Sequence, residues 1–391
     1  MTDRLGYAAS RFPRHAQYSA NTAEPTVFLA SLMAQALRHG LPARRRGGQI
    51  ASWVGRRGLP TKAVAGLLRA LPRQESPDLD ALLDDLKAAW PRLANESGRL
   101  PATPPAMSAL ALNRSAGRTV FVFGSQAHPL VVVKQPTTGH QGVATEAAAL
   151  RAAASAAIAP ALLGWLGGAS VQEGLPGQPA PVVPVDPTRA GLLPWTPDFE
   201  QLQDALSRLA AETAQRADLT ERLLAPLDVA LASDVIGPRE RELLKAARRD
   251  LGALDVAVLQ HGDASAQNWL VAEGRFQALV DWELATSSGI PGFDILNAAV
   301  SHVEHGVGLL RWSEDRVIEA FRRAWSDSPL FARARNAARE AAMATGVPGR
   351  LVEQLEVAFF GRRLGRRLTA PQRYPVGPQG ASAILAAACE S

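Results

Sequence analysis

Cysteine is almost absent from the chain, since Cys389 is the only one among 391 residues. A single thiol excludes a disulfide framework and a metal site built from several cysteines. Strongly apolar runs are also missing, because the uncharged stretch 152–172 is mostly alanine and is interrupted by Pro160 and three glycines. A membrane-spanning helix needs about 20 strongly apolar residues, so none is predicted. Charges and prolines within residues 1–31 predict no signal peptide, and we expect a cytoplasmic protein.

Lysine is rare as well, with four residues among the 42 lysines and arginines, and the net charge is only +5. Arginines cluster at 44–46 with 56–57 and at 362–363 with 366–367, but no aromatic residues are interleaved with them to stack on bases. A solvated surface or a nearby anionic ligand explains such clusters without a nucleic acid. We therefore expect no nucleic-acid partner and no membrane partner.

What the chain does contain is typical of a globular protein, with 47% hydrophobic and 20% charged residues. At about 150 residues per domain, the length predicts two or three domains. Residues 1–100 are predicted to form a helical extension, with apolar residues at helical spacing in 25–39 and 61–70. A third helix is predicted to start at Ser76 and to end before Pro91, and a proline-rich linker follows.

The hydrophobic period changes after this linker. Three short runs rich in β-branched and aromatic residues predict an antiparallel meander of strands: 108–112, 118–123 and 130–134. A helix at 145–157 and a strand at 169–173 are expected next, and helical segments then dominate. The pattern predicts an α+β protein, with a β-rich part at 101–177 and a larger, mainly helical part at 178–391.

The most informative stretch begins at His261 and reads His-Gly-Asp-Ala-Ser-Ala-Gln-Asn. Two short strands joined by a glycine-containing turn follow and predict a β-hairpin that leads to Asp281. Because both ends of a hairpin lie on the same side, Asn268 before it and Asp281 after it should be neighbours. Asp263 precedes Asn268 by five residues, so two aspartates and an asparagine are predicted to converge. Their oxygens are hard ligands that suit Mg²⁺.

The spacing between Asp263 and Asn268 is that of a phosphoryl-transfer site. In such sites one aspartate orients the nucleophilic hydroxyl group, while an asparagine and a second aspartate hold the metal ions. The pattern Asp-x-x-x-x-Asn is that of the catalytic loop of protein kinases. Two positions depart from protein kinases, because Gly262 stands where arginine is usual and Asp281 is followed by Trp-Glu instead of Phe-Gly.

This stretch resembles the aminoglycoside phosphotransferase and choline kinase-like family, whose motif is His-Gly-Asp with an asparagine five residues after the aspartate. The resemblance implies a protein-kinase-like fold of two lobes, here preceded by the helical extension. It implies that Asp263 orients the acceptor hydroxyl or accepts its proton, and that Asn268 and Asp281 bind Mg²⁺. Asp294 matches the acid that braces the catalytic loop, and His261 matches a structural histidine without a catalytic role.

The same resemblance assigns a nucleotide-binding lobe to residues 101–177. Lys134 matches the lysine that contacts nucleotide phosphates, and Glu146 matches its ion-pair partner. Gly117 lies in the loop that would cover the phosphates, although a Gly-x-Gly-x-x-Gly motif is missing there. Glu173 opens the segment that resembles the hinge between the lobes, where backbone groups would meet the nucleobase.

The implied activity is transfer of the γ-phosphoryl group of ATP or GTP, with Mg²⁺, to a hydroxyl group of a small molecule. A sugar, an aminoglycoside, an amino alcohol or a glycan precursor would each fit as the acceptor, and residues 178–391 would supply catalysis and the acceptor site.

Two other interpretations stay open. The first is a non-catalytic kinase-like module that binds nucleotide or a partner, and the intact Asp263, Asn268 and Asp281 argue against it. The second is an enzyme that modifies proteins, but the short interval between Asp281 and Asp294 leaves little room for a regulated loop.

Overall fold

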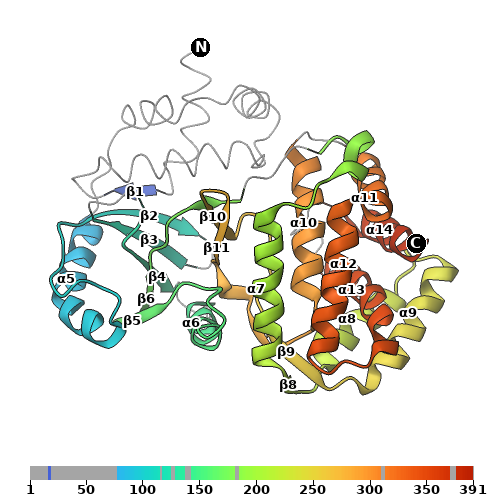
Figure 1. Cartoon of the computed structure of the whole chain (residues 1–391), viewed down its shortest axis with the longest axis horizontal. Helices are drawn as coiled ribbons and strands as arrows, with labels where there is room; N and C mark the ends of the chain where they lie inside the picture. The colour runs from blue at the N-terminus through green and yellow to red at the C-terminus, as the bar shows by residue number, and fades with distance from the viewer. Residues whose placement is uncertain are drawn as a thin grey trace, which may run out of the picture. The chain divides into compact units, whose positions relative to one another are not determined.

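The chain forms two compact units in the computed structural model (Figure 1). The structure describes residues 16–18, 77–114, 117–124, 128–136, 142–180, 185–309, 313–369 and 376–390. The first unit contains the described residues up to Ala180 together with Trp269–Glu273 and Gln277–Leu284, and the second unit contains the others. The helices predicted at 25–39 and 61–70 lie outside the described residues.

An antiparallel six-stranded sheet forms the centre of the first unit, with the order β1-β2-β3-β4-β6-β5. Its strands are Ala16–Tyr18 (β1), Ser108–Arg114 (β2), Gly117–Phe123 (β3), Val131–Pro136 (β4), Leu162–Leu166 (β5) and Ala169–Glu173 (β6). The predicted meander is confirmed as β2, β3 and β4, in which β-branched and aromatic residues favour the extended backbone.

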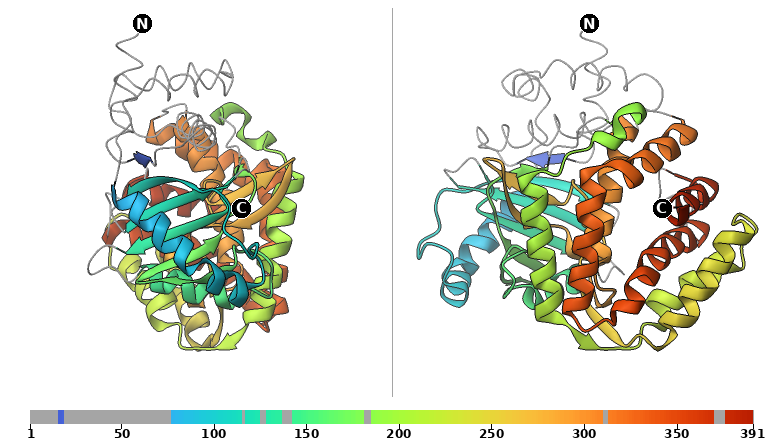
Figure 2. Two further views of the ribbon diagram at one scale, coloured as in Figure 1. Left: turned by 90° about the vertical axis from the view of Figure 1, so that its left-hand side faces the viewer. Right: turned by 45° about the vertical axis from the view of Figure 1, so that its right-hand side comes forward.

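Helix α5 (Pro77–Ser97) covers one face of this sheet (Figure 2, left). The helix begins at a proline and has two aspartates in its first turn, as its sequence predicts. The prediction that it ends before Pro91 is wrong, because it continues through Pro91 to Ser97. A proline inside a helix removes one backbone hydrogen bond. Trp90 and Leu93 on either side of this proline are fully buried, and tertiary packing stabilises the helix despite that loss.

The alternation of side chains along the strands determines which residues α5 buries. Val131 and Val133 of β4 belong to the apolar core beneath α5, together with Val122 of β3 and Val171 of β6. Lys134 follows Val133 directly, so its side chain lies on the opposite face of the sheet.

Helix α6 (Gly142–Ala152) contacts β4 and β6 of the same sheet. It is the helix predicted at 145–157, but it begins and ends earlier. The turns after Ala152 lead to Ala157, whose φ of 50° is left-handed and incompatible with an α-helix. The N-terminal part of α6 carries Glu146.

Eight helices of the described residues form most of the second unit. They are α7 (Pro197–Thr213), α8 (Ala225–Leu231), α9 (Pro238–Asp250), α10 (Phe293–Leu309), α11 (Glu314–Asp327), α12 (Pro329–Ala344), α13 (Gly349–Thr369) and α14 (Pro378–Glu390). Helices α7 and α12 run side by side (Figure 2, right). An aromatic cluster of Phe321, Trp325, Phe331 and Phe360 joins α11, α12 and α13, with ring centroids 5.0–5.7 Å apart.

Two small sheets complete the architecture. One has the order β12-β9-β8 and belongs to the second unit, with β8 at Gln215–Arg216, β9 at Val256–Gln260 and β12 at Thr286–Gly289. The other has the order β11-β10-β7, with β7 at Gln178–Pro179, β10 at Trp269–Ala272 and β11 at Arg275–Leu279. Strands β10 and β11 are the predicted hairpin, and Glu273 (φ 51°) and Gly274 (φ 73°) form its left-handed turn. The α+β class predicted from the sequence is confirmed.

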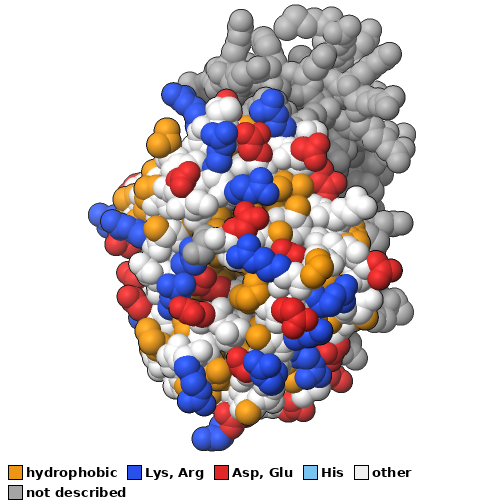
Figure 3. All heavy atoms as spheres, turned by 90° about the vertical axis from the view of Figure 1, so that its right-hand side faces the viewer, with side chains coloured by type: hydrophobic (Ala, Val, Ile, Leu, Met, Phe, Trp, Pro, Cys, Tyr) orange, Lys and Arg blue, Asp and Glu red, His pale blue; other side chains and the backbone are white. Residues whose placement is uncertain are grey.

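Among the helices of the described part, none has both the length and the apolar character that crossing a bilayer requires. Acidic and basic side chains are interspersed over the face of the second unit drawn in Figure 3, so neither sign of charge dominates that face.

Candidate active site

Lys134 is the centre of an ion-pair network in the first unit. Its ammonium group donates hydrogen bonds to Oε1 of Glu146 at 2.6 Å and to Oδ1 of Asp281 at 2.9 Å. The side chain of Lys134 is only 14% exposed and that of Glu146 is 1% exposed. Burial alone would lower the pKa of Lys134, but the charges of Asp281 and Glu146 raise it above the usual value. Lys134 therefore stays charged throughout the physiological range.

Asp281 is held in place both by the contact of its side chain with Lys134 and by the contacts of the backbone that follows it. Its φ of 69° is left-handed, which is unusual for a residue with a Cβ atom. The next residue, Trp282, is fully buried and donates its backbone N–H to Oε1 of Glu146 at 3.1 Å and its indole N–H to the Leu279 carbonyl at 2.8 Å. Glu146 thus holds both Lys134 and the segment that carries Asp281.

A shallow hollow that is open to solvent lies beside this network. Lys134, Glu146 and Asp281 line it together with Gly117 at the start of β3 and Glu283. A Cβ atom at Gly117 would lie 2.4 Å from the carbonyl oxygen of Gln135 in β4, so only glycine permits this close approach of the two strands.

Glu173 does not line this hollow. It ends β6, where its N–H donates to the Ala161 carbonyl at 2.8 Å. Its carboxylate forms an ion pair with Arg99 at 3.0 Å. The side chain is thus engaged with the segment that follows α5, and a role at a nucleobase would fall to the backbone of this segment.

Asp263 and Asn268 meet in the second unit, in the loop that follows β9. The side-chain amide of Asn268 donates to both the backbone oxygen and Oδ2 of Asp263, each at 2.9 Å. The backbone N–H of Asp263 donates to Nδ1 of His261 at 3.2 Å, and His261 is fully buried. Gly262 between them has a φ of 84°, which glycine adopts without strain. These contacts orient the Asp263 carboxylate.

The side chain of Asp294, at the start of α10, binds the backbone of this loop. One carboxylate oxygen accepts the N–H of His261 at 2.6 Å, and the other accepts the N–H of Gly262 at 3.1 Å. Burial raises the pKa of Asp294, while the electrostatic influence of the neighbouring His261 and the hydrogen bonds that the carboxylate accepts oppose that shift. The carboxylate thus replaces water as the partner of two loop N–H groups.

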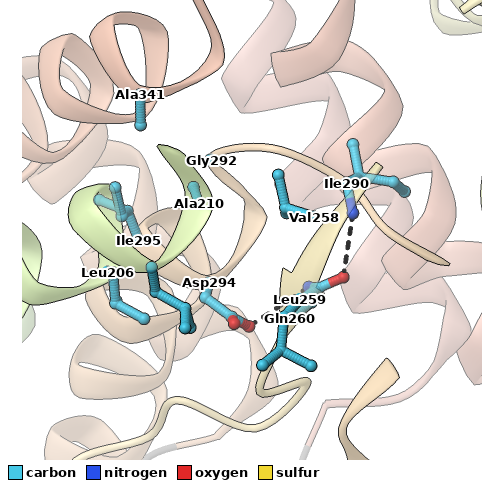
Figure 4. A pocket seen from close by; sticks show the side chains of 11 residues that line it. Leu206, Ala210, Val258, Leu259, Gln260, Ile290, Gly292, Asp294, Ile295 and Ala341 are labelled. Carbon is cyan, nitrogen blue, oxygen red and sulfur yellow. Dashed lines mark hydrogen bonds between the residues drawn. The ribbon is translucent and has the colours of Figure 1, made fainter. Parts of the chain in front are cut away.

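Gln260 is a polar residue of this arrangement that sequence reasoning missed. Its side chain is buried beside Asp294 in the pocket of Figure 4, where it donates to Asp294 at 3.2 Å and accepts the Ile290 N–H at 3.3 Å. The only signal in the sequence was a polar residue at the end of an apolar strand.

The two residues predicted to bind Mg²⁺ are Asn268 and Asp281. Among the described residues, no three His, Cys, Asp or Glu side chains gather into a metal site. Mg²⁺ at phosphoryl-transfer sites is commonly bound by one or two protein oxygens together with substrate phosphates, and Asn268 and Asp281 fit that donor set. Asp281 belongs to the first unit and Asn268 to the second, so their predicted proximity stays a prediction.

The model of a phosphotransferase enzyme family matches residues 111–338, which is more than half of the chain. The chain belongs to this family. The predictions of the family and of an enzyme that acts on hydroxyl groups are thereby confirmed, and the phosphotransferase match includes every predicted site residue from Gly117 to Asp294.

Several solved structures are similar to this phosphotransferase. A protein assigned as an aminoglycoside phosphotransferase from Ralstonia eutropha JMP134 is 14% identical, with a TM-score of 0.47 over 79% of this chain and 98% of its own. The macrolide 2'-phosphotransferase from Brachybacterium faecium is 20% identical, with a TM-score of 0.39 over 79% and 98%. A choline/ethanolamine kinase family protein from Mesorhizobium loti is 18% identical, with a TM-score of 0.35 over 79% and 99%. No curated protein sequence matches the chain significantly.

Proposed function

We propose that this phosphotransferase transfers the γ-phosphoryl group of ATP or GTP to a hydroxyl group of a small molecule. The observation that carries the proposal is the network of Lys134, Glu146 and Asp281, which places one fixed positive charge beside the hollow of the first unit. A lysine ammonium is a compact charge that suits nucleotide phosphates. Gly117 and the backbone around Glu173 are proposed to complete the nucleotide site.

Asn268 and Asp281 are proposed to hold Mg²⁺. When bound, the ion would neutralise charge on the phosphate oxygens. The amide of Asn268 has its nitrogen engaged by Asp263, which directs the carbonyl oxygen away from that carboxylate and leaves it suited to a cation.

Asp263 is proposed to orient the acceptor hydroxyl and to receive its proton. The acceptor oxygen forms a new bond to the γ-phosphorus, the bond from that phosphorus to the bridging oxygen breaks, and the nucleoside diphosphate leaves. Such catalysis consists mostly of positioning and electrostatic stabilisation. The hydrogen bonds from Asn268 and the support of the loop by Asp294 supply that positioning for the Asp263 carboxylate.

The proposal is tested by measuring nucleoside diphosphate formation from ATP and from GTP with a panel of small alcohols as acceptors. Asp263→Asn should lower turnover by about 10²–10⁴-fold, the usual contribution of general acid–base catalysis, without loss of nucleotide binding. The exposed Asp84→Asn is the matched control and should keep full turnover. Nucleotide binding without turnover of any acceptor would instead favour the non-catalytic module.

A further inference from the structure

The contact between Lys134 and Asp281 joins two groups that the proposed function assigns to different ligands. Lys134 is proposed to bind the nucleotide phosphates, and Asp281 is proposed to bind Mg²⁺. Here the ammonium group donates to Oδ1 of Asp281 at 2.9 Å, so each group is the partner of the other. Both side chains line the hollow of the first unit, with 14% of Lys134 and 19% of Asp281 exposed. A ligand in the hollow can therefore reach both.

The two carboxylates that bind Lys134 differ in how firmly they are held. Glu146 is 1% exposed, lies 2.6 Å from the ammonium group and also accepts the backbone N–H of Trp282. Asp281 is more exposed, and its contact with Lys134 is longer. Breaking the contact with Glu146 would leave a buried charge without its partner, whereas Asp281 can bind a ligand in the hollow instead. The bond between Lys134 and Asp281 is thus the one that a ligand can replace.

The ammonium group of Lys134 competes with a divalent cation for Asp281. Both cations would bind the two oxygens of one small carboxylate, and positive charges so close together repel each other. Salt screens partly buried charges weakly, so this repulsion persists in solution. Phosphate groups in the hollow change the balance, because their oxygens accept hydrogen bonds from the ammonium group and add the negative charge that two cations require.

We propose that Lys134 blocks Asp281 against divalent cations until nucleotide phosphates enter the hollow. The phosphates then accept the hydrogen bond that Asp281 accepted before, Glu146 keeps Lys134 in place, and the Asp281 carboxylate becomes available to Mg²⁺. This inference rests on the proposed function, because it assigns an order to the same two ligands. Nucleotide and metal should strengthen each other's binding by the same factor, since coupling between two sites is reciprocal.

Metal binding without nucleotide tests the proposed block. Mn²⁺ serves as the probe for Mg²⁺, and electron paramagnetic resonance measures the free ion during titration of the full-length chain. Lys134→Met keeps an unbranched side chain but removes the ammonium group. This variant should bind Mn²⁺ at least tenfold more tightly than the wild type, which lies within the usual range of coupling between sites.

Two further variants show where this gain arises. Lys134→Met combined with Asp281→Asn should bind Mn²⁺ no more tightly than the wild type, because the carboxylate that would bind the ion is missing. Lys87→Met removes a lysine that pairs with Asp84 at 2.8 Å, where both side chains are exposed. It is the matched control and should leave the affinity for Mn²⁺ unchanged.

A second measurement does not require replacement of Lys134. Asp281→Asn keeps the size of the side chain but removes the charge that holds the ammonium group, so the affinity for ATP in EDTA should rise at least fivefold. Lys134 forms its ion pairs with Glu146 and Asp281. Glu283→Gln therefore removes an equal charge from the same hollow without removing either ion pair, and its gain should be smaller.

The inference is overturned if the wild type binds Mn²⁺ as tightly as Lys134→Met, or if Asp281→Asn gains no more affinity for metal-free ATP than Glu283→Gln. If Lys134→Met does not fold, the comparison with metal-free ATP decides alone. A wild-type chain that binds no nucleotide in the presence of Mg²⁺ would contradict the proposed function itself. The two failures are therefore distinguishable.

Discussion

The ammonium group of Lys134 lies 2.9 Å from Oδ1 of Asp281, although the two residues are 147 positions apart in the sequence. Glu146 reaches the same ammonium group at 2.6 Å and binds the backbone of Trp282. One buried carboxylate therefore fixes both the proposed phosphate ligand and the segment of the proposed metal ligand.

The substitution Lys134→Arg tests whether this geometry matters beyond its charge. Arginine keeps the positive charge but spreads it over a larger planar group that cannot replace a compact ammonium between two carboxylates. We expect the affinity for ATP, measured by calorimetry, to fall at least tenfold while the fold is retained. The exposed Lys87→Arg is the control and should leave the affinity unchanged. Equal affinities of wild type and Lys134→Arg would show that a positive charge alone suffices.

Glu304 should make the second unit sensitive to acid. Burial alone would raise its pKa, but the charges of Arg363 and Arg367 outweigh burial and lower it to about 2. A lowered carboxyl pKa adds stability above the pKa of the unfolded chain, near 4.3, and this stability is lost as pH falls towards 2. The wild type should therefore lose about 2 kcal/mol between pH 6 and pH 3 through this group, as measured by urea unfolding.

The variant Glu304→Gln should remove that part of the pH dependence. It should also be less stable at pH 6, by about 3–5 kcal/mol, because it leaves the buried Arg367 without its carboxylate. Glu319→Gln is the control, since Glu319 pairs with Arg323 on an exposed surface and should change stability by about 1 kcal/mol at most. Identical acid profiles of wild type and Glu304→Gln would contradict the assignment.

Helix α5 is predicted to be essential to the stability of the sheet that carries Lys134. Trp90 is fully buried in the core beneath α5, and its indole N–H donates to the Pro101 carbonyl at 2.8 Å. Trp90→Ala should lower the free energy of unfolding by about 3–5 kcal/mol, as large-to-small core substitutions do. Leu192→Ala, at a side chain that is 75% exposed, should change it by about 0.5 kcal/mol or less. Similar unfolding midpoints for the two variants would show that α5 contributes little.

Local patterns in the sequence were sufficient for the strands, whereas the pairing of Lys134 with Glu146 followed from the resemblance to the family. Alternating β-branched residues define β2 to β4, and a lone lysine at a strand end followed by a helical glutamate matched a known arrangement. The contacts of Asp263 with Asn268 follow from a spacing of five residues within one loop. Each of these features depends on residues close in sequence or on a family motif.

Features that depend on tertiary packing could not be predicted. The sequence shows that α5 is amphipathic but does not show which sheet it packs against. Packing against this sheet also stabilises the helix beyond Pro91. Gln260 belongs to no local pattern, because its hydrogen-bond partners Asp294 and Ile290 come from a distant segment. Its surroundings become visible only when β9 and the start of α10 are placed together.

Calorimetric titration of the full-length chain with ATP and GTP, with and without Mg²⁺, tests the central claim most directly. The account predicts binding of at least one nucleotide that strengthens with Mg²⁺. It also predicts a loss of at least tenfold in the Mg²⁺-dependent affinity in Asp281→Asn, where a charged oxygen ligand becomes a neutral amide. The exposed Asp80→Asn should behave as the wild type. Binding that is indifferent to Mg²⁺, or equal in wild type and Asp281→Asn, would contradict the account.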